Sequence, residues 1–104
     1  MAVESAPGDV VRVRVVNTDN GPMSVWVTGA RYRVLAIDGY DVNEPQPVDS
    51  QALTVTAGGR ADLEVVTPKT GARVELGGNA ALLVGPGAET LVADEAPREF
   101  VDPL

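Results

Sequence analysis

The sequence predicts an all-β domain, a Greek-key β-sandwich or barrel of about seven short strands. Several segments alternate apolar and polar residues with a period of two, the pattern of half-buried strands. Glycine and proline turn signals separate these segments, and no segment combines a helical period with helix caps. A chain of 104 residues is long enough for one core. We therefore expect one sandwich domain over residues 1–88, followed by an acidic tail or interdomain linker over residues 89–104.

The opening strand, residues 10–16, shows the clearest alternation. Its valines are spaced to share the buried face, and its arginines are spaced to share the solvated face. The residues concerned are Val11, Val13 and Val15 on the first face and Arg12 and Arg14 on the second.

The second expected strand, residues 23–27, carries the only tryptophan of the chain. Met23, Val25 and Val27 are buried together only if Trp26 points the other way, because a slip by one residue exchanges the two faces of a strand. We therefore expect Trp26 on the outer surface, covered by a loop or marking an interface with a neighbouring domain. Its truncation should then cost within about 1 kcal/mol, far less than the loss of a core aromatic residue.

Five further segments complete the set of strands. Turn sequences rich in glycine separate most of them, and two prolines interrupt the stretch before residue 50. Proline cannot donate a hydrogen bond to a sheet, so this stretch suits a connection that crosses between two sheets. The five expected strands are residues 31–37, 52–56, 60–66, 72–76 and 81–85.

Charge limits the choice of partners. The net charge is −7, and residues 89–104 carry five acids against one arginine. Binding to nucleic acid or to an anionic membrane surface requires clustered Lys and Arg, so we expect neither. No stretch approaches the roughly 18 consecutive apolar residues that span a bilayer, so we expect no membrane insertion by this segment.

A succession of short motifs between Gly8 and Val65 resembles a cupredoxin-like domain of a multicopper oxidase. The resemblance is to the second, copper-free domain of the three-domain, laccase-like enzymes. The sequence departs from the family pattern at Ala30, where the family often has histidine, and at Ala61, where it often has tyrosine. The matching pieces are a first strand ending in Asn17, the turn at Thr28-Gly29, the strand ending at Asp38-Gly39, the stretch Pro47 to Ser50, and the stretch Thr56 to Val65 with Gly58, Gly59, Arg60 and Asp62.

The resemblance implies a metal-free structural domain. A blue-copper site needs two imidazoles and a thiolate, and this chain contains neither histidine nor cysteine. Met23 is a core residue rather than an axial ligand without partners. The family then implies a domain without catalysis of its own, which holds copper-bearing neighbours apart in an extracytoplasmic oxidoreductase. Its expected partners are neighbouring cupredoxin domains or another protein.

An acid-rich turn leaves a second function class open. Asp38, Asp41, Asn43 and Glu44 offer several oxygen ligands within one loop, as calcium requires. We favour a plain turn with solvated acids, because Asp and Asn serve turns readily. The alternatives are a stand-alone binding module for a protein or sugar, with or without calcium, and, more weakly, a hydrolase that uses carboxylates only.

Four arginines alternate along the non-core face of two strands. We favour solvated arginines paired with Asp62 or Glu64, since surface ion pairs are common and individually weak. The alternative is a partner-binding patch together with Trp26. The arginines are Arg12, Arg14, Arg31 and Arg33.

Overall fold

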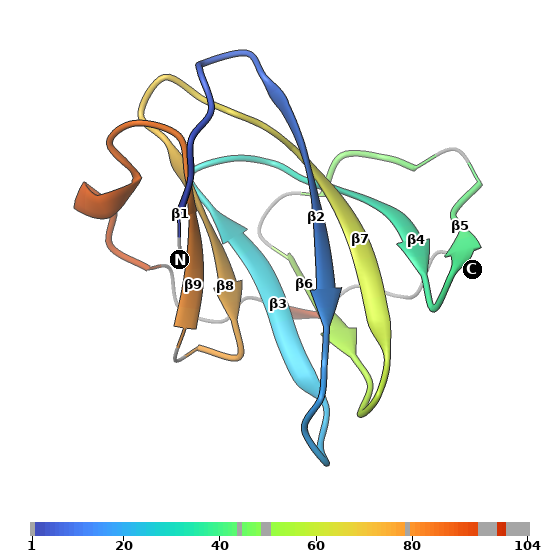
Figure 1. Ribbon diagram of the computed structural model, residues 1–104. Coiled ribbons are helices and arrows are strands. Elements are labelled where there is room, and N and C mark those ends of the chain that lie inside the picture. Colours follow the sequence, from blue (N-terminus) through green and yellow to red (C-terminus); the bar gives the residue numbers. More distant parts are fainter. Residues whose placement is uncertain (1, 44, 49–50, 79, 94–97, 100–104) are drawn as a thin grey trace.

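Two β-sheets face one another in a sandwich, so the predicted all-β fold class is confirmed. The protein is described by a computed structural model, which defines residues 2–43, 45–48, 51–78, 80–93 and 98–99. Strands β2 and β7 lie in the front sheet of Figure 1, and β3, β8 and β9 lie in the sheet beside and behind them. Hydrophobic side chains from both sheets meet between them.

The larger sheet has six strands in the order β1-β9-β8-β3-β6-β10. Its central pairs are antiparallel, whereas the two short strands at its edges pair in parallel with β9 and β6. In chain order the strands are β1 (Ala2–Val3), β3 (Met23–Thr28), β6 (Gln51–Val55), β8 (Ala72–Leu76), β9 (Ala80–Val84) and β10 (Arg98–Glu99).

The smaller sheet has four antiparallel strands in the order β2-β7-β4-β5. Strands β2 and β7 pair over seven residues each, which makes them the longest strands among the described residues. The strands are β2 (Val10–Val16), β4 (Arg33–Ile37), β5 (Tyr40–Asp41) and β7 (Arg60–Val66).

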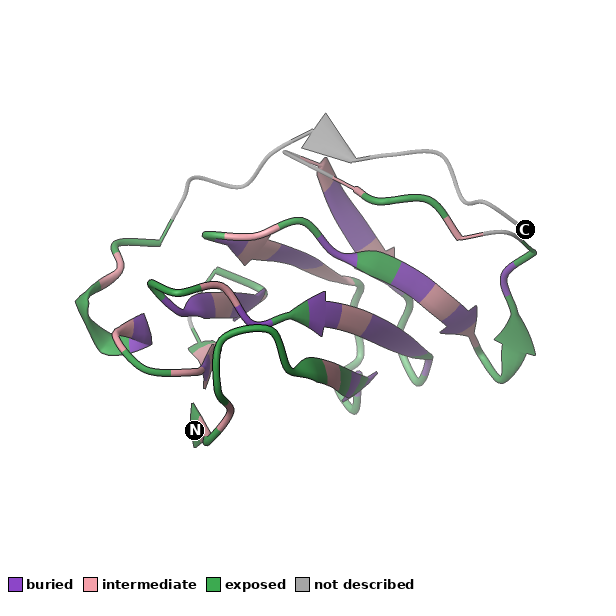
Figure 2. Cartoon of the chain, turned by 90° about the horizontal axis from the view of Figure 1, so that it is seen from above, coloured by how far each residue is buried: buried purple, intermediate pink, exposed green. Residues whose placement is uncertain are grey.

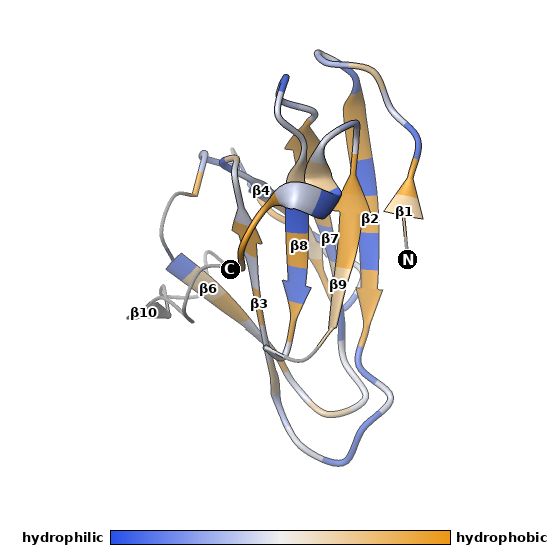
Figure 3. Cartoon of the chain, turned by 90° about the vertical axis from the view of Figure 1, so that its left-hand side faces the viewer, coloured by the Kyte–Doolittle hydropathy of each residue, from blue (hydrophilic) through white to orange (hydrophobic). Residues whose placement is uncertain are grey.

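The core is built mainly from valine, which suits two sheets packed face to face. Most strand residues in Figure 2 are buried or intermediate. Exposed and less exposed residues alternate along β2, and hydrophilic and hydrophobic residues alternate along the same strand in Figure 3. The pattern confirms the period-two argument for β2, whose valines at 13 and 15 belong to the core. The fully buried side chains include Val25, Leu63, Val65, Val74 and Val84.

The expected strand bounds hold for β2, β7 and β8 and differ by one or two residues for the others. Strand β4 begins at Arg33 rather than Arg31, and its pairing with β7 shifts register between Val34 and Ala36. This bulge inserts an extra residue and so returns Ile37 to the core side. The short strands β1, β5 and β10 and the 3-10 helix η1 (Ala88–Thr90) carry no periodic signal and were not expected.

The connection with two prolines crosses between the sheets, as its composition predicts. It leaves β5 in the smaller sheet and leads to β6 in the larger one. Val48 in this connection forms an isolated bridge with Tyr32, and the two main-chain hydrogen bonds measure 2.6 and 3.1 Å. No helix in the described part of the chain has the length and apolar character needed to cross a membrane.

Candidate functional site

Three residues of the sequence motifs, Asn17, Asp38 and Arg60, lie at the end of the smaller sheet where β2 ends and β7 begins. Asn17 is buried there, and its side-chain amide donates to the carbonyl oxygens of Gly21 at 2.8 Å, Val55 at 3.0 Å and Thr56 at 3.2 Å. Its main-chain amide also donates to the oxygen of Gly59 at 2.9 Å. Because a buried polar group is costly unless it is bonded, these contacts fix Asn17 as a structural link between two turns and β6.

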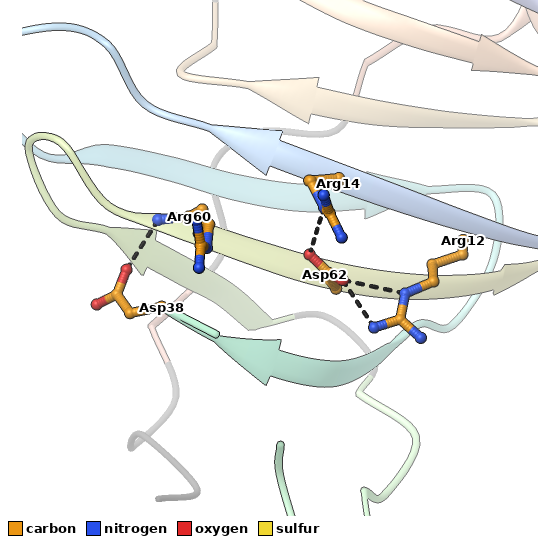
Figure 4. A network of polar contacts seen from close by, with 5 residues as sticks. All are labelled: Arg12, Arg14, Asp38, Arg60 and Asp62. Carbon is orange, nitrogen blue, oxygen red and sulfur yellow. Dashed lines mark hydrogen bonds and ion pairs between the residues drawn. The ribbon is translucent and has the colours of Figure 1, made fainter. Parts of the chain in front are cut away.

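Asp38, which follows β4, and Arg60, which begins β7, are joined at the same end of the sheet (Figure 4). The Asp38 carboxylate accepts a hydrogen bond from the Arg60 main-chain amide at 2.9 Å. In turn, the Asp38 main-chain amide donates to the Arg60 carbonyl oxygen at 2.9 Å. Asp38 adopts a left-handed backbone with φ of 51°. Gly39 follows at φ of 86°, and a Cβ there would lie 2.8 Å from a guanidinium nitrogen of Arg60. The positive φ is the reason for glycine at this position, because the guanidinium is the end of a flexible, exposed side chain and could move aside.

The acid-rich turn is spread out rather than focused. The Asp38 carboxylate is directed to the Arg60 amide, whereas Asp41 ends β5 and is exposed, as is Asn43. Glu44 lies outside the described residues. Within the described ranges no three acidic or other ligating side chains gather closely enough to hold a metal ion. The calcium hypothesis stays a prediction.

The outer face of the smaller sheet carries the predicted arginines. Arg12 bonds Oδ2 of Asp62 through Nε at 3.0 Å and through NH2 at 2.7 Å, and Arg14 lies 3.4 Å from Oδ1. The side chains of Arg12 and Arg14 are 58% and 69% exposed, while that of Asp62 is 9% exposed. The hydrogen bond from Arg12 and the positive charge of both arginines lower the pKa of Asp62, against the opposing effect of its burial.

The other two predicted arginines lie near β4. Arg33 is 3.7 Å from Glu64 on β7, and Arg31 precedes the strand and is exposed. Both line a shallow hollow of about 370 Å³, whose remaining walls are Ala30, Tyr32, Pro47, Glu64 and Val66. The favoured interpretation, arginines paired with Asp62 or Glu64, therefore describes Arg12, Arg14 and Arg33.

Trp26 is the main correction to the sequence analysis. The predicted register is right, since Val25 lies in the core and Met23 and Val27 pack against it. Trp26 accordingly lies on the other face, opposite Glu75 of β8, and outside the core cluster. It is nevertheless only 4% exposed, and its indole nitrogen is buried without a hydrogen-bond partner among the described residues. Strand alternation identifies the face but not whether other parts of the molecule cover that face.

A partly buried ion pair lies beside Trp26 and was not expected. The side chain of Glu75 is 3% exposed, and Arg73 reaches both of its carboxylate oxygens, at 3.0 and 3.2 Å. Thr28 donates its hydroxyl to the same carboxylate at 2.8 Å, and Arg73 also contacts the Leu91 carbonyl at 3.4 Å. The hydrogen bond and charge of Glu75 raise the pKa of Arg73. The sequence signal was the alternation of Arg73 and Glu75 in β8, which also describes an ordinary solvated face.

The side chains of this fold do not fit a copper centre. Imidazole and thiolate donors are absent from the whole sequence, which has no histidine and no cysteine. Met23 offers the one thioether among the described residues, and it packs against the hydrophobic core. A thioether alone does not make a copper site.

Comparisons with known proteins point to one kind of fold. No family model matches the chain, and no curated protein matches it. Among solved structures, a multi-copper oxidase from Pseudomonas thermotolerans is 31% identical with a TM-score of 0.64, over 99% of this chain and 24% of that one. Fet3p, a multicopper oxidase that functions in iron import, is 18% identical with a TM-score of 0.64, over 98% and 22%.

The chain thus spans about a quarter of the length of the solved structures that it matches. The likeness extends over nearly all of its residues and agrees with the two-sheet arrangement. The motif residues at Asn17, Asp38 and Arg60 hold the end of that sandwich together. The chain therefore folds as a cupredoxin-like domain.

Proposed function

We propose that this chain is a copper-free structural domain of a multicopper-oxidase-type protein, equivalent to the second domain of three-domain enzymes. Its function is to hold neighbouring cupredoxin domains at a fixed separation, and it carries no catalysis of its own. The protein to which it belongs is then an extracytoplasmic oxidoreductase whose copper is bound by other domains. The observation that carries the proposal is a cupredoxin-like fold built from a sequence without imidazole or thiolate.

The polar side chains of the domain support a structural role. Asn17, Asp38 and Asp62 are engaged in contacts within the domain rather than converging on an open cavity. Glu75 is likewise held by Arg73 and Thr28. The indole nitrogen of Trp26 is the exception among the described residues, since it is buried without a partner. The internal contacts of the other polar side chains favour a rigid domain, as a spacer requires.

Copper reconstitution tests the proposal. The purified chain is incubated with Cu(II) or Cu(I), desalted, and examined by metal analysis, visible absorption and an oxidase assay on phenols and metal ions. We expect no stoichiometric copper, no intense thiolate-to-copper band and no oxidase activity. Stoichiometric copper with a blue band would overturn the proposal.

Calcium distinguishes the alternative of a binding module. A ligand that binds only the folded state raises the melting temperature, by an amount that grows with its concentration over Kd. We expect millimolar calcium to leave the melting temperature unchanged. A rise that is abolished by Asp41→Asn would instead favour a calcium-dependent module.

A further inference from the structure

Strand β2 forms an open edge of the smaller sheet. Strand β7 is its only pairing partner within the described part of the chain. The other edge of this sheet, β5, is two residues long, whereas β2 runs for seven residues from Val10 to Val16. A long edge strand presents a row of unpaired main-chain groups, which can pair with an added strand.

The register determines which main-chain groups face outward. Asp9 accepts a hydrogen bond from the Thr67 amide, and the Asn17 amide donates to the oxygen of Gly59, so the bonds to β7 fall on odd-numbered residues. In an antiparallel pair such bonds alternate along the strand. The amides and carbonyls of Arg12 and Arg14 are therefore directed away from β7, to the open edge.

Strand β7 shows which sequence pairs well with β2. Its acids lie opposite the arginines, with Glu64 facing Arg12 and Asp62 facing Arg14 across the pair. Leu63 lies between them, opposite Val13. The partner of β2 on the occupied side thus alternates acidic and apolar residues, and opposite charges stabilise such cross-strand neighbours.

The positive charge beside the open edge of β2 also favours acidic residues in an added strand. The outer face of the smaller sheet, with Arg31 beside it, carries more arginines than acids, although the whole chain has a net charge of −7. The arginines are Arg12, Arg14, Arg31, Arg33 and Arg60, and the acids are Asp41, Asp62 and Glu64. Arg14 is 69% exposed, and within the described part of the chain its acidic contact is with Asp62, at 3.4 Å. A second copy of β2 paired in antiparallel fashion about Val13 would instead place Arg12 opposite Arg14, which like charges disfavour.

We infer that β2 is a docking edge for an extended segment of a partner protein that alternates acidic and apolar residues. The segment adds a fifth strand beside Val10–Val16, with main-chain bonds to Arg12 and Arg14 and carboxylates beside their guanidinium groups. The inference does not depend on the proposed spacer function.

The probe is a capped synthetic peptide with the sequence of residues 61–66, ADLEVV. Amide hydrogen exchange of the folded chain is measured by NMR with and without the peptide at millimolar concentration. We expect protection to rise at the amides of Arg12 and Arg14, while the amides of Val11, Val13 and Val15 are already protected by β7. High salt should reduce the effect, because the contact is partly electrostatic.

N-methylated peptides separate strand addition from simple charge attraction. In the proposed geometry the amides of the peptide Asp and Glu face β2, so methylating those two abolishes binding. Methylating the amides of the peptide Leu and of the Val that directly follows Glu leaves binding intact. A peptide with Asn and Gln in place of the acids should bind more weakly by about fivefold or more.

Two matched variants locate the site. Arg14→Gln and Arg33→Gln remove the same charge from the same face, but Arg33 lies on β4, two strands from the open edge. We expect Arg14→Gln to weaken binding about two- to fivefold and Arg33→Gln to change it by less than about twofold.

Several results would overturn the inference. They are an absence of new protection at Arg12 and Arg14, equal binding of both N-methylated peptides, and equal effects of the two glutamine variants. Protection at these amides without peptide would also overturn it, because it would show that the edge is already occupied. If that protection increased with protein concentration, the occupant would be a second copy of the chain.

Discussion

The outer faces of the two sheets use the same residue types in different surroundings. On the smaller sheet, Asp62 is paired with arginines that are more than half exposed. On the larger sheet, Glu75 and its arginine partner are both largely covered, and a threonine hydroxyl completes the contact. The comparison shows that alternation along a strand determines which residues leave the core, whereas coverage of the outer face determines what they contribute.

Coverage changes the energetic balance of an ion pair. Exposed pairs are screened by water and typically contribute less than about 1 kcal/mol. A carboxylate removed from water requires its partners, because an unpaired charge there is strongly destabilising. The Asp62 carboxylate is also mostly covered, but its arginines remain in water, whereas both members of the Glu75 pair are largely covered. We therefore expect substitutions on the larger sheet to have the larger effects.

The largest expected effect is that of Trp26→Ala. Trp26 is 4% exposed, so its truncation removes a large buried apolar surface. It should cost about 3 kcal/mol or more, which replaces the loss of about 1 kcal/mol or less expected from the sequence alone. Urea unfolding followed by circular dichroism measures this loss. Tyr40→Ala is the matched control, because Tyr40 is an exposed aromatic residue and should cost less than about 0.5 kcal/mol. Similar small losses for both variants would show that the outer face of the larger sheet is open.

Thr28→Val should have an intermediate effect. The substitution keeps the shape of the side chain but removes the hydroxyl that donates to the Glu75 carboxylate at 2.8 Å. A hydrogen bond to a buried charged group contributes about 1.5 kcal/mol or more. The same urea measurement applies, and Thr18→Val at an exposed position provides the control. A neutral Thr28→Val would mean that water reaches Glu75.

Asp62→Asn should have the smallest effect, and that effect should depend on pH. Because Arg12 lowers the pKa of Asp62, the ionised carboxylate stabilises the folded state above its usual pKa of 3.8, and this contribution is lost as pH falls through the lower folded value. We expect a loss of about 1 kcal/mol near neutral pH that shrinks below about pH 4. Unfolding curves at several pH values measure it. A difference that grows toward acid pH would contradict the assigned sign.

The fold could be predicted because period-two alternation and glycine turns are local properties of the sequence. Strands β2 and β7 were located to the residue, and the register of β3 followed from the requirement to bury Met23, Val25 and Val27 together. The short strands β1, β5 and β10 were missed because two residues show no period. Their pairing depends on where distant strands place an edge.

The candidate site was only partly predictable. The pairing of Arg12 and Arg14 with Asp62 follows from alternation on neighbouring strands. The burial of Trp26 and Glu75 depends on what covers the outer face of the larger sheet, and no short stretch of sequence contains that information. The engagement of Asp38 with Arg60 joins residues 22 positions apart and required the register of β4 on β7.

Fluorescence of the single tryptophan most directly tests the claim that one outer face is covered and the other open. Trp26 is the only tryptophan, so the emission spectrum and its quenching by acrylamide report on that face alone. We predict a blue-shifted emission and weak quenching for the folded chain, with both reverting to solvent-exposed values in urea. Emission and quenching that match the urea-unfolded chain under native conditions would contradict the account.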